Sequence, residues 1–113
     1  MASADIVIRR GTTKPDIAWR LGSDANPFDG TGSTFVLTIR SGGNSIVLST
    51  AEPASGLTYD NDTRLLLWRR TLADSRKISA GRVGRYEVER RIGGEQSTIV
   101  EGAVTGKDSI SDD

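Results

Sequence analysis

Short stretches of alternating apolar and polar residues recur along most of the chain, separated by clusters of Gly, Asn, Asp, Ser and Pro. Alternation with a period of two places successive side chains on opposite faces of a strand, so each stretch predicts a β-strand with one buried face. Strands at this close spacing, without long helical segments between them, are typical of a sandwich or barrel. The predicted strands cover residues 5–10, 17–21, 35–40, 45–50, 56–59 and 63–69, and both arms of a hairpin over 84–106.

The hairpin over residues 84–106 carries the clearest local signal. Gly93 and Gly94 separate two runs rich in Tyr, Val, Ile and Thr, and a tight reversal favours glycine because it needs positive φ angles. Alternation along the first arm predicts two faces. Tyr86, Val88, Arg90 and Ile92 share one face, and Arg85, Glu87, Glu89 and Arg91 share the other.

The stretch 63–69 differs from the other predicted strands because both of its faces are apolar. Leu65 and Leu67 alternate with Leu66 and Trp68. We expect a central strand with one face in the core and the other covered by a loop, a terminus or another subunit.

The segment 71–80 that follows is the only one with helical character. Thr71 and Asp74 have the spacing of a short capping box, so a short helix that crosses between two sheets is expected. Together these elements predict an all-β fold, an antiparallel immunoglobulin-like β-sandwich of about seven to eight strands with one short helix near residues 71–80. A single domain over residues 5–105 and a polar acidic tail over 106–113 are predicted.

Composition narrows the functional classes. The 113 residues contain 15 Lys plus Arg and 15 Asp plus Glu, so the net charge is zero and no long-range field draws the chain to nucleic acid or an anionic membrane. Cysteine and histidine are both absent. This excludes disulfides, thiolate metal sites, and nucleophile pairs that depend on a histidine base. We therefore predict no enzymatic activity, no cofactor, and no catalytic, cofactor-binding or metal-binding residue.

Two acidic motifs resemble sites but have simpler explanations. Glu87 and Glu89 lie two residues apart on one strand face between arginines, where they form no cleft, so cross-strand pairing explains them better than acid–base catalysis. We interpret them as partners of Arg85 and Arg91 on the sheet surface. Residues 60–62 (Asp-Asn-Asp) look like the start of a calcium loop, but the glycine and the later glutamate of that motif are missing. A turn is expected there.

Three arginine doublets are the main candidates for contact with a partner. Neighbouring residues in a strand point to opposite faces, so each doublet directs one guanidinium to each side of its sheet, and the inward member can leave through the open end of the sandwich. Two explanations stay open: an arginine-rich rim that binds carboxylates or carbonyls of a partner, and solvated rims paired with local acids. The candidate interface residues are Arg9, Arg10, Arg69, Arg70, Arg90, Arg91 and Trp68.

The two tryptophans, Trp19 and Trp68, also admit two explanations. Aromatic faces stack on sugars, but a chain with this few aromatic residues needs them in its core. We expect both to be buried, with Trp68, on the doubly apolar strand, the better interface candidate of the two.

The order of elements resembles a family of small β-sandwich proteins of tailed phages, which includes the N-terminal domain of the baseplate upper protein. The resemblance covers the chain to about Thr105. It rests on a first strand that closes in Arg-Gly-Thr-Thr (10–13), a strand with Trp19, the turn Asn-Pro-Phe-Asp-Gly-Thr-Gly (26–32), Ile39-Arg40, Ala80-Gly81, Gly84-Arg85-Tyr86 and a last strand that ends in Glu-Gly-Ala-Val-Thr (101–105). The chain departs from this pattern at Ser23-Asp24-Ala25 and in its acidic tail.

This resemblance implies a structural protein of the virion, a tail-tip or baseplate component that docks in multiple copies on other tail proteins. It supplies no catalytic residues. A capsid decoration protein and a carbohydrate-binding or adhesion module stay open as alternatives. The first five residues lack the features of a signal peptide, so synthesis in the host cytoplasm and location in the virion are expected, without nucleic-acid or membrane partners.

Overall fold

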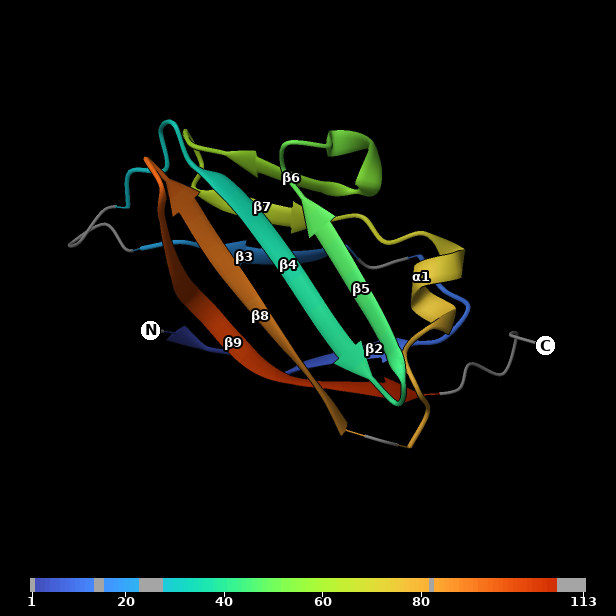
Figure 1. Cartoon of the computed structure of the whole chain (residues 1–113). Coiled ribbons are helices and arrows are strands. Elements are labelled where there is room, and N and C mark those ends of the chain that lie inside the picture. Colours follow the sequence, from blue (N-terminus) through green and yellow to red (C-terminus); the bar gives the residue numbers. More distant parts are fainter. Residues whose placement is uncertain (1, 14–15, 23–27, 82, 108–113) are drawn as a thin grey trace.

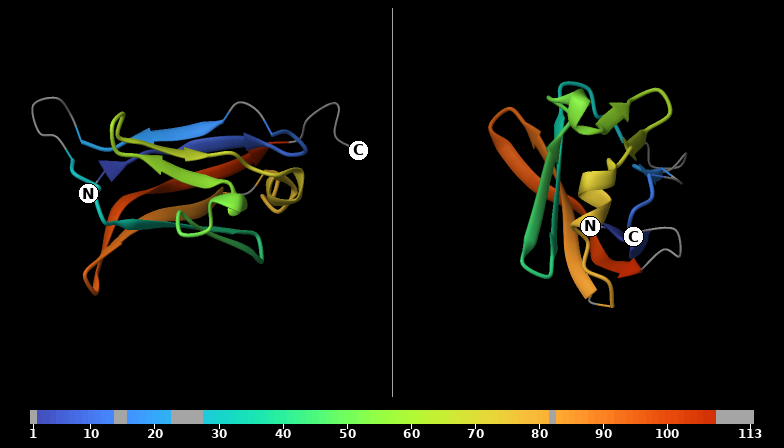
Figure 2. Two further views of the ribbon diagram at one scale, coloured as in Figure 1. Left: turned by 90° about the horizontal axis from the view of Figure 1, so that it is seen from above. Right: turned by 90° about the vertical axis from the view of Figure 1, so that its right-hand side faces the viewer.

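The structure is a computed structural model that describes residues 2–13, 16–22, 28–81 and 83–107. Within these residues, two β-sheets lie face to face and enclose one core (Figure 1). Figure 2 shows the two layers from above and from one end. This arrangement is a β-sandwich, in which the inner faces of the two sheets supply the core.

The larger sheet has six strands and the smaller sheet has three. The larger contains β1 (Ala2–Ser3), β2 (Ile6–Arg9), β4 (Thr34–Ser41), β5 (Asn44–Ser49), β8 (Val83–Ile92) and β9 (Glu95–Lys107). The smaller contains β3 (Ile17–Arg20), β6 (Leu57–Asp60) and β7 (Leu65–Trp68). A 3-10 turn, η1 (Pro53–Ser55), precedes β6, and a single helical turn, α1 (Leu72–Arg76), links β7 to β8 across the two sheets.

Strand order confirms the predicted immunoglobulin-like sandwich. The sequence β9-β8-β4-β5 in one sheet faces β3-β7-β6 in the other. Counted along the chain, this is the arrangement of immunoglobulin sandwiches, where strands G, F and C with an added C′ oppose strands B, E and D. The pairs among these strands are antiparallel, whereas β1 and β2 run parallel to β9 along its outer edge.

The core forms between alternating inward side chains of both sheets. Trp68 and Phe35 are the largest side chains without exposed surface. The remaining fully buried apolar residues are Ile8, Leu37, Ile39, Leu57, Leu66, Ile78, Val88 and Val104. Burial of Leu66 and Trp68 confirms that one face of the doubly apolar strand lies in the core, and the pairing of β7 with both β3 and β6 confirms that it is central.

A pair of aromatic residues joins the two sheets through the core. The rings of Trp19 on β3 and Tyr86 on β8 lie 5.6 Å apart, and Trp19 Nε1 donates a hydrogen bond of 3.1 Å to the Tyr86 hydroxyl. Tyr86 in turn donates to the carbonyl oxygen of Ala4. In antibody domains a disulfide joins the equivalent strands B and F. Here, in a chain without cysteine, an aromatic contact and a hydrogen bond make the corresponding link.

The hairpin of β8 and β9 matches its prediction. Gly93 has a φ of 57° and Gly94 a φ of 83°, as a two-residue reversal between twisted strands requires. Opposite Tyr86, Gly102 leaves room for the N-terminal segment. A Cβ atom on Gly102 would overlap the carbonyl oxygen of Ala4.

Two predicted boundaries were wrong. The sheet begins at Ala2 and not at residue 5, because the short strand β1 pairs with Val100 and Glu101. Residues 106 and 107 belong to β9, because they pair in parallel with Ile8 and Arg9, so the predicted tail begins later, and 108–113 lie outside the described residues. The short helix expected near residues 71–80 is confirmed as the single turn α1. Thr71 caps it as expected by accepting a hydrogen bond from the Asp74 amide.

Candidate functional site

Each arginine doublet has one buried or half-buried member and one exposed member, although only Arg90 and Arg91 both lie within a strand. Arg10, Arg70 and Arg90 are the inward members, and Arg9, Arg69 and Arg91 are the outward ones. All three inward guanidinium groups leave the sandwich near its ends, where each donates to a main-chain carbonyl oxygen of a loop or helix end.

Arg90 holds the loop that leads into β4. Its Nε donates to Ser33 Oγ and its Nη2 donates to the Asp29 carbonyl, both at 2.8 Å. The guanidinium carbon also lies 4.6 Å from the centre of the Phe28 ring, within the range of a cation–π contact. The loop is therefore fixed to β8 by three contacts of one side chain.

Arg70 has the same role at the opposite end. It is 5% exposed, and its Nε and Nη2 donate to the carbonyl and the hydroxyl of Thr12 at 3.0 and 3.2 Å. Burial lowers the pKa of Arg70, and the nearby Asp16 partly opposes that shift. Arg10 acts in the same region, where its Nη2 donates to the carbonyl of Arg76 at the end of α1, over 3.3 Å.

The outward members make weaker contacts. Arg69 lies 3.7 Å from Asp16, and Arg91 lies 3.4 Å from Glu89, with the Arg69 side chain 70% exposed. Exposed pairs of this kind contribute about 0 to 1 kcal/mol. Arg9 is exposed at the end of β2.

Four of the seven interface candidates make contacts within their own chain or are buried in it. Arg10, Arg70 and Arg90 donate hydrogen bonds to carbonyl oxygens of their own chain. Trp68 has no exposed surface and does not reach a partner. Trp19 is 6% exposed, which confirms the expectation that both tryptophans are buried.

The Asp-Asn-Asp segment at 60–62 forms the predicted turn, and Asn61 in it stabilises the neighbouring loop. Its Oδ1 accepts from the Gly30 amide at 2.8 Å and from the Tyr59 hydroxyl at 3.0 Å. Asp29 accepts from the Thr31 amide at 3.0 Å, and hydrogen bonds from Thr31 are the main reason that the pKa of Asp29 is lowered. These hydrogen bonds involve residues 29–31 of the turn motif at 26–32, whose first two residues lie outside the described residues.

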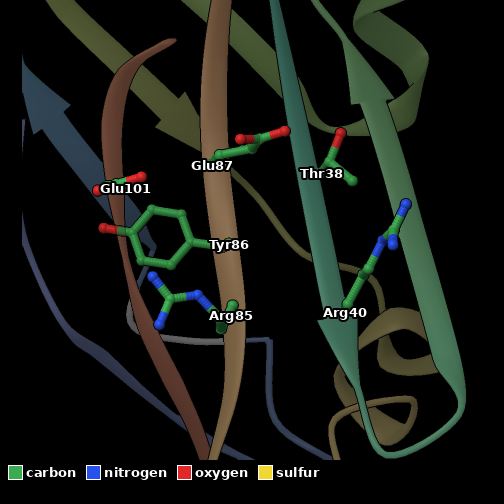
Figure 3. A pocket seen from close by; sticks show the side chains of 6 residues that line it. All are labelled: Thr38, Arg40, Arg85, Tyr86, Glu87 and Glu101. Atoms are coloured by element: carbon green, nitrogen blue, oxygen red, sulfur yellow. The ribbon is translucent and has the colours of Figure 1, made fainter.

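A different set of charges lies on the outer face of the large sheet (Figure 3). Arg85 and Glu87 stand on β8, Glu101 on β9, and Thr38 and Arg40 on β4, around a shallow depression of about 300 Å³. Strand register places Arg40 directly opposite Arg85, and Glu87 directly opposite Glu101. Among the described residues, none of these four charged side chains takes part in an ion pair or a hydrogen bond.

One predicted ion pair on this face is present and another is absent among the described residues. Glu89 pairs with Arg91 as expected, but the predicted partner of Glu87, Arg85, forms no ion pair with it in the described part of the chain. Sequence reasoning missed Arg40 and Glu101. Each lies opposite a residue of the same charge only because of the register between neighbouring strands, and no local feature of the sequence predicts that register.

The outer face of the small sheet is more apolar. Leu65 is 38% exposed and Leu67 is half-buried there, between Ala18 on β3 and Thr58 on β6. No group of three or more acidic side chains suited to a metal ion occurs in the residues that the structure covers. In the same residues, no helix is both long and apolar enough to cross a membrane.

Comparison with known proteins assigns no family. No protein-family model and no curated protein matches the chain. Among solved structures, extracellular domains 3–5 of Drosophila OTK are similar, with a TM-score of 0.40 and 10% sequence identity over 96% of this chain and 33% of that chain. The chain thus spans about a third of the length of that structure, and a likeness at this level assigns neither family nor function. The resemblance to phage sandwiches stays a prediction.

Proposed function

We propose that the protein is a non-catalytic structural subunit that assembles with other proteins through the outer faces of its sandwich, as a tail-tip or baseplate component of a phage particle. The virion assignment rests on the resemblance that covers the chain to about Thr105. The assembly role rests on one observation. Four charged side chains on the outer face of the large sheet have no partner in the described chain, whereas the arginines at the ends are bound.

The shape of the surface favours assembly over catalysis. The depression between Thr38 and Glu101 is open and lined by side chains of a flat sheet face. Catalytic sites need a cleft that excludes water around groups with matched pKa values. Glu87 and Glu101 lie opposite each other on this open face, where no cleft encloses the two carboxylates.

Of the two alternatives, the carbohydrate-binding module loses its main support. A sugar platform needs an exposed aromatic face, and Trp19 and Trp68 are 6% and 0% exposed. A capsid decoration protein would use the same sandwich on the head of the particle. Location separates it from a tail component.

The test is the position of the chain in purified particles. Antibodies against the protein, viewed by electron microscopy, are expected to label the tail end, and mass spectrometry of separated heads and tails is expected to find the chain with the tails. Labelling confined to capsomers would select the decoration protein. Absence from particles that are otherwise complete would contradict the virion role.

A further inference from the structure

The outer face of the large sheet combines two like-charged rows. One row holds Arg40 on β4 beside Arg85 on β8, and the next row, two residues along β8, holds Glu87 beside Glu101 on β9. Like charges directly opposite each other on neighbouring strands are destabilising. Diagonal neighbours of opposite sign lie about 7 to 8 Å apart between Cα atoms, which compensates only in part.

The pattern of these charges defines the surface that would neutralise them. A partner must place carboxylates over the arginine row and guanidinium groups over the glutamate row. The face itself has this pattern, in reverse order along the strands. Two copies can be related by a two-fold axis that lies midway between their facing sheets, perpendicular to the strands and between the two rows. Rotation about this axis places the arginine row of one copy over the glutamate row of the other.

We infer that a second copy of this chain packs on the outer face of the large sheet about such an axis. Arg85 of each copy then faces Glu87 of the other. Arg40 flanks the same Glu87, and Glu101 flanks Arg85 of the opposite copy, so each charge gains a neighbour of opposite sign. The exposed Val47 on β5, in the same row as Thr38 and Glu87, adds apolar area at the border. This inference goes beyond the proposed function, because self-association requires no other protein.

The size of the face sets the strength of the dimer. Four strands, β9, β8, β4 and β5, form it over the seven register pairs from Thr34 to Arg40. At standard strand dimensions this is an area of roughly 19 by 24 Å, or about 450 Å² per copy. Stable complexes bury about 800 Å² per partner, so a face of this size is expected to support only a weak dimer.

Sedimentation velocity of the whole chain from about 10 μM to about 1 mM covers the concentrations at which a weak dimer is expected to form. A monomer–dimer equilibrium is expected that shifts to monomer in about 1 M NaCl, where the Debye length falls to about 3 Å. Reversal of one charge, in Arg85→Glu or Glu87→Arg, is expected to raise the Kd at least about tenfold, because two like-charged contacts form in each dimer. A wild-type chain that stays monomeric at 1 mM would overturn the inference.

An equal mixture of the two single variants provides the sharpest test. One variant then presents only acidic groups and the other only basic groups at these positions, so the mixed dimer is expected to recover the wild-type Kd. Glu52→Arg, an equal charge change in the turn after β5, is the matched control and should leave the Kd unchanged. If a reversal prevents folding, Arg85→Gln with Glu87→Gln replaces it and should weaken association. A dimer that none of these changes affects, or a mixture that fails to associate, would overturn the proposed arrangement.

Discussion

The ends of the sandwich and the outer face of the large sheet both carry arginine, yet the fold treats the two regions differently. At the ends, Arg70 and Arg90 donate to loop carbonyls over 2.8 to 3.0 Å. On the outer face, Arg40 and Arg85 lie directly opposite each other, and neither side chain has a hydrogen-bond or ion-pair partner among the described residues. The end arginines therefore contribute to folding, whereas those on the face are available for assembly. Changes at the ends should alter stability, and changes on the face should alter association.

Substitutions in the core, between the two regions, are expected to have the largest effects on the free energy of unfolding. Trp19→Ala is expected to lower the free energy of unfolding by about 3 to 5 kcal/mol, because it leaves a cavity and removes the hydrogen bond to Tyr86. Urea unfolding followed by circular dichroism measures the change. Leu65→Ala, at a position 38% exposed, is the control and should have a much smaller effect. An unfolding midpoint that hardly moves in Trp19→Ala would mean that this side chain is not part of the core.

The doublet at residues 69 and 70 tests the end region within two adjacent positions. Arg70→Ala is expected to cost about 2 to 3 kcal/mol, because the Thr12 carbonyl loses a charged donor at a buried site. Arg69→Ala removes only an exposed pair with Asp16 and should cost less than about 1 kcal/mol. The same unfolding measurement compares them. Equal costs would contradict the division into bound and exposed members.

The doublet at residues 90 and 91 repeats this test at the other end with a smaller expected effect. Arg90→Ala is expected to cost about 1 to 2 kcal/mol, since the loop at 28–33 keeps its contacts with Asn61. Hydrogen exchange at the Thr31 and Ser33 amides should become faster. Arg91→Ala should change neither stability nor exchange by a measurable amount. Unchanged exchange in Arg90→Ala would show that this side chain does not hold the loop.

Alkaline pH tests the link between the sheets. Burial raises the pKa of Tyr86 above the ordinary value of 10.0, and burial does the same for Tyr59. The unfolded chain therefore loses these protons first, so their contribution to stability is complete below about pH 10 and is lost as pH rises towards the folded-state pKa. Unfolding in urea between pH 8 and 11, measured for wild type and Tyr86→Phe, should show a shallower decline in the variant. Parallel curves would mean that Tyr86 ionises equally in both states.

Local sequence signals account for the strands, the hairpin turn and the division of the doublet at residues 90 and 91. Period-two alternation places Arg90 inward and Arg91 outward without any knowledge of tertiary contacts, and two adjacent glycines are enough to place the reversal at 93 and 94. Register between distant strands is different. Arg40 and Arg85 are 45 positions apart, and a shift of one residue would bring other side chains opposite each other. The like-charged rows were therefore not predictable from the sequence.

The N-terminal strands and the inward arginines show a second limit. Nothing in the sequence of residues 2–9 distinguishes antiparallel pairing from the parallel pairing with β9 that the structure shows. The doublets were correctly expected to direct one member inward, but the identity of its acceptors depends on loops that are remote in sequence. Thr12 is 58 residues from Arg70, and Asp29 is 61 residues from Arg90. Such contacts follow from the assembled fold and not from local propensity.

The division of roles between the ends and the face is tested most directly by Arg85→Glu, with stability and association measured on the same samples. The account predicts an unfolding free energy within about 0.5 kcal/mol of wild type, as is usual for surface substitutions, together with loss of the concentration-dependent dimer in sedimentation velocity. A variant that is clearly destabilised while its association matches that of wild type would contradict the account, because the outer face would then serve the fold and not assembly.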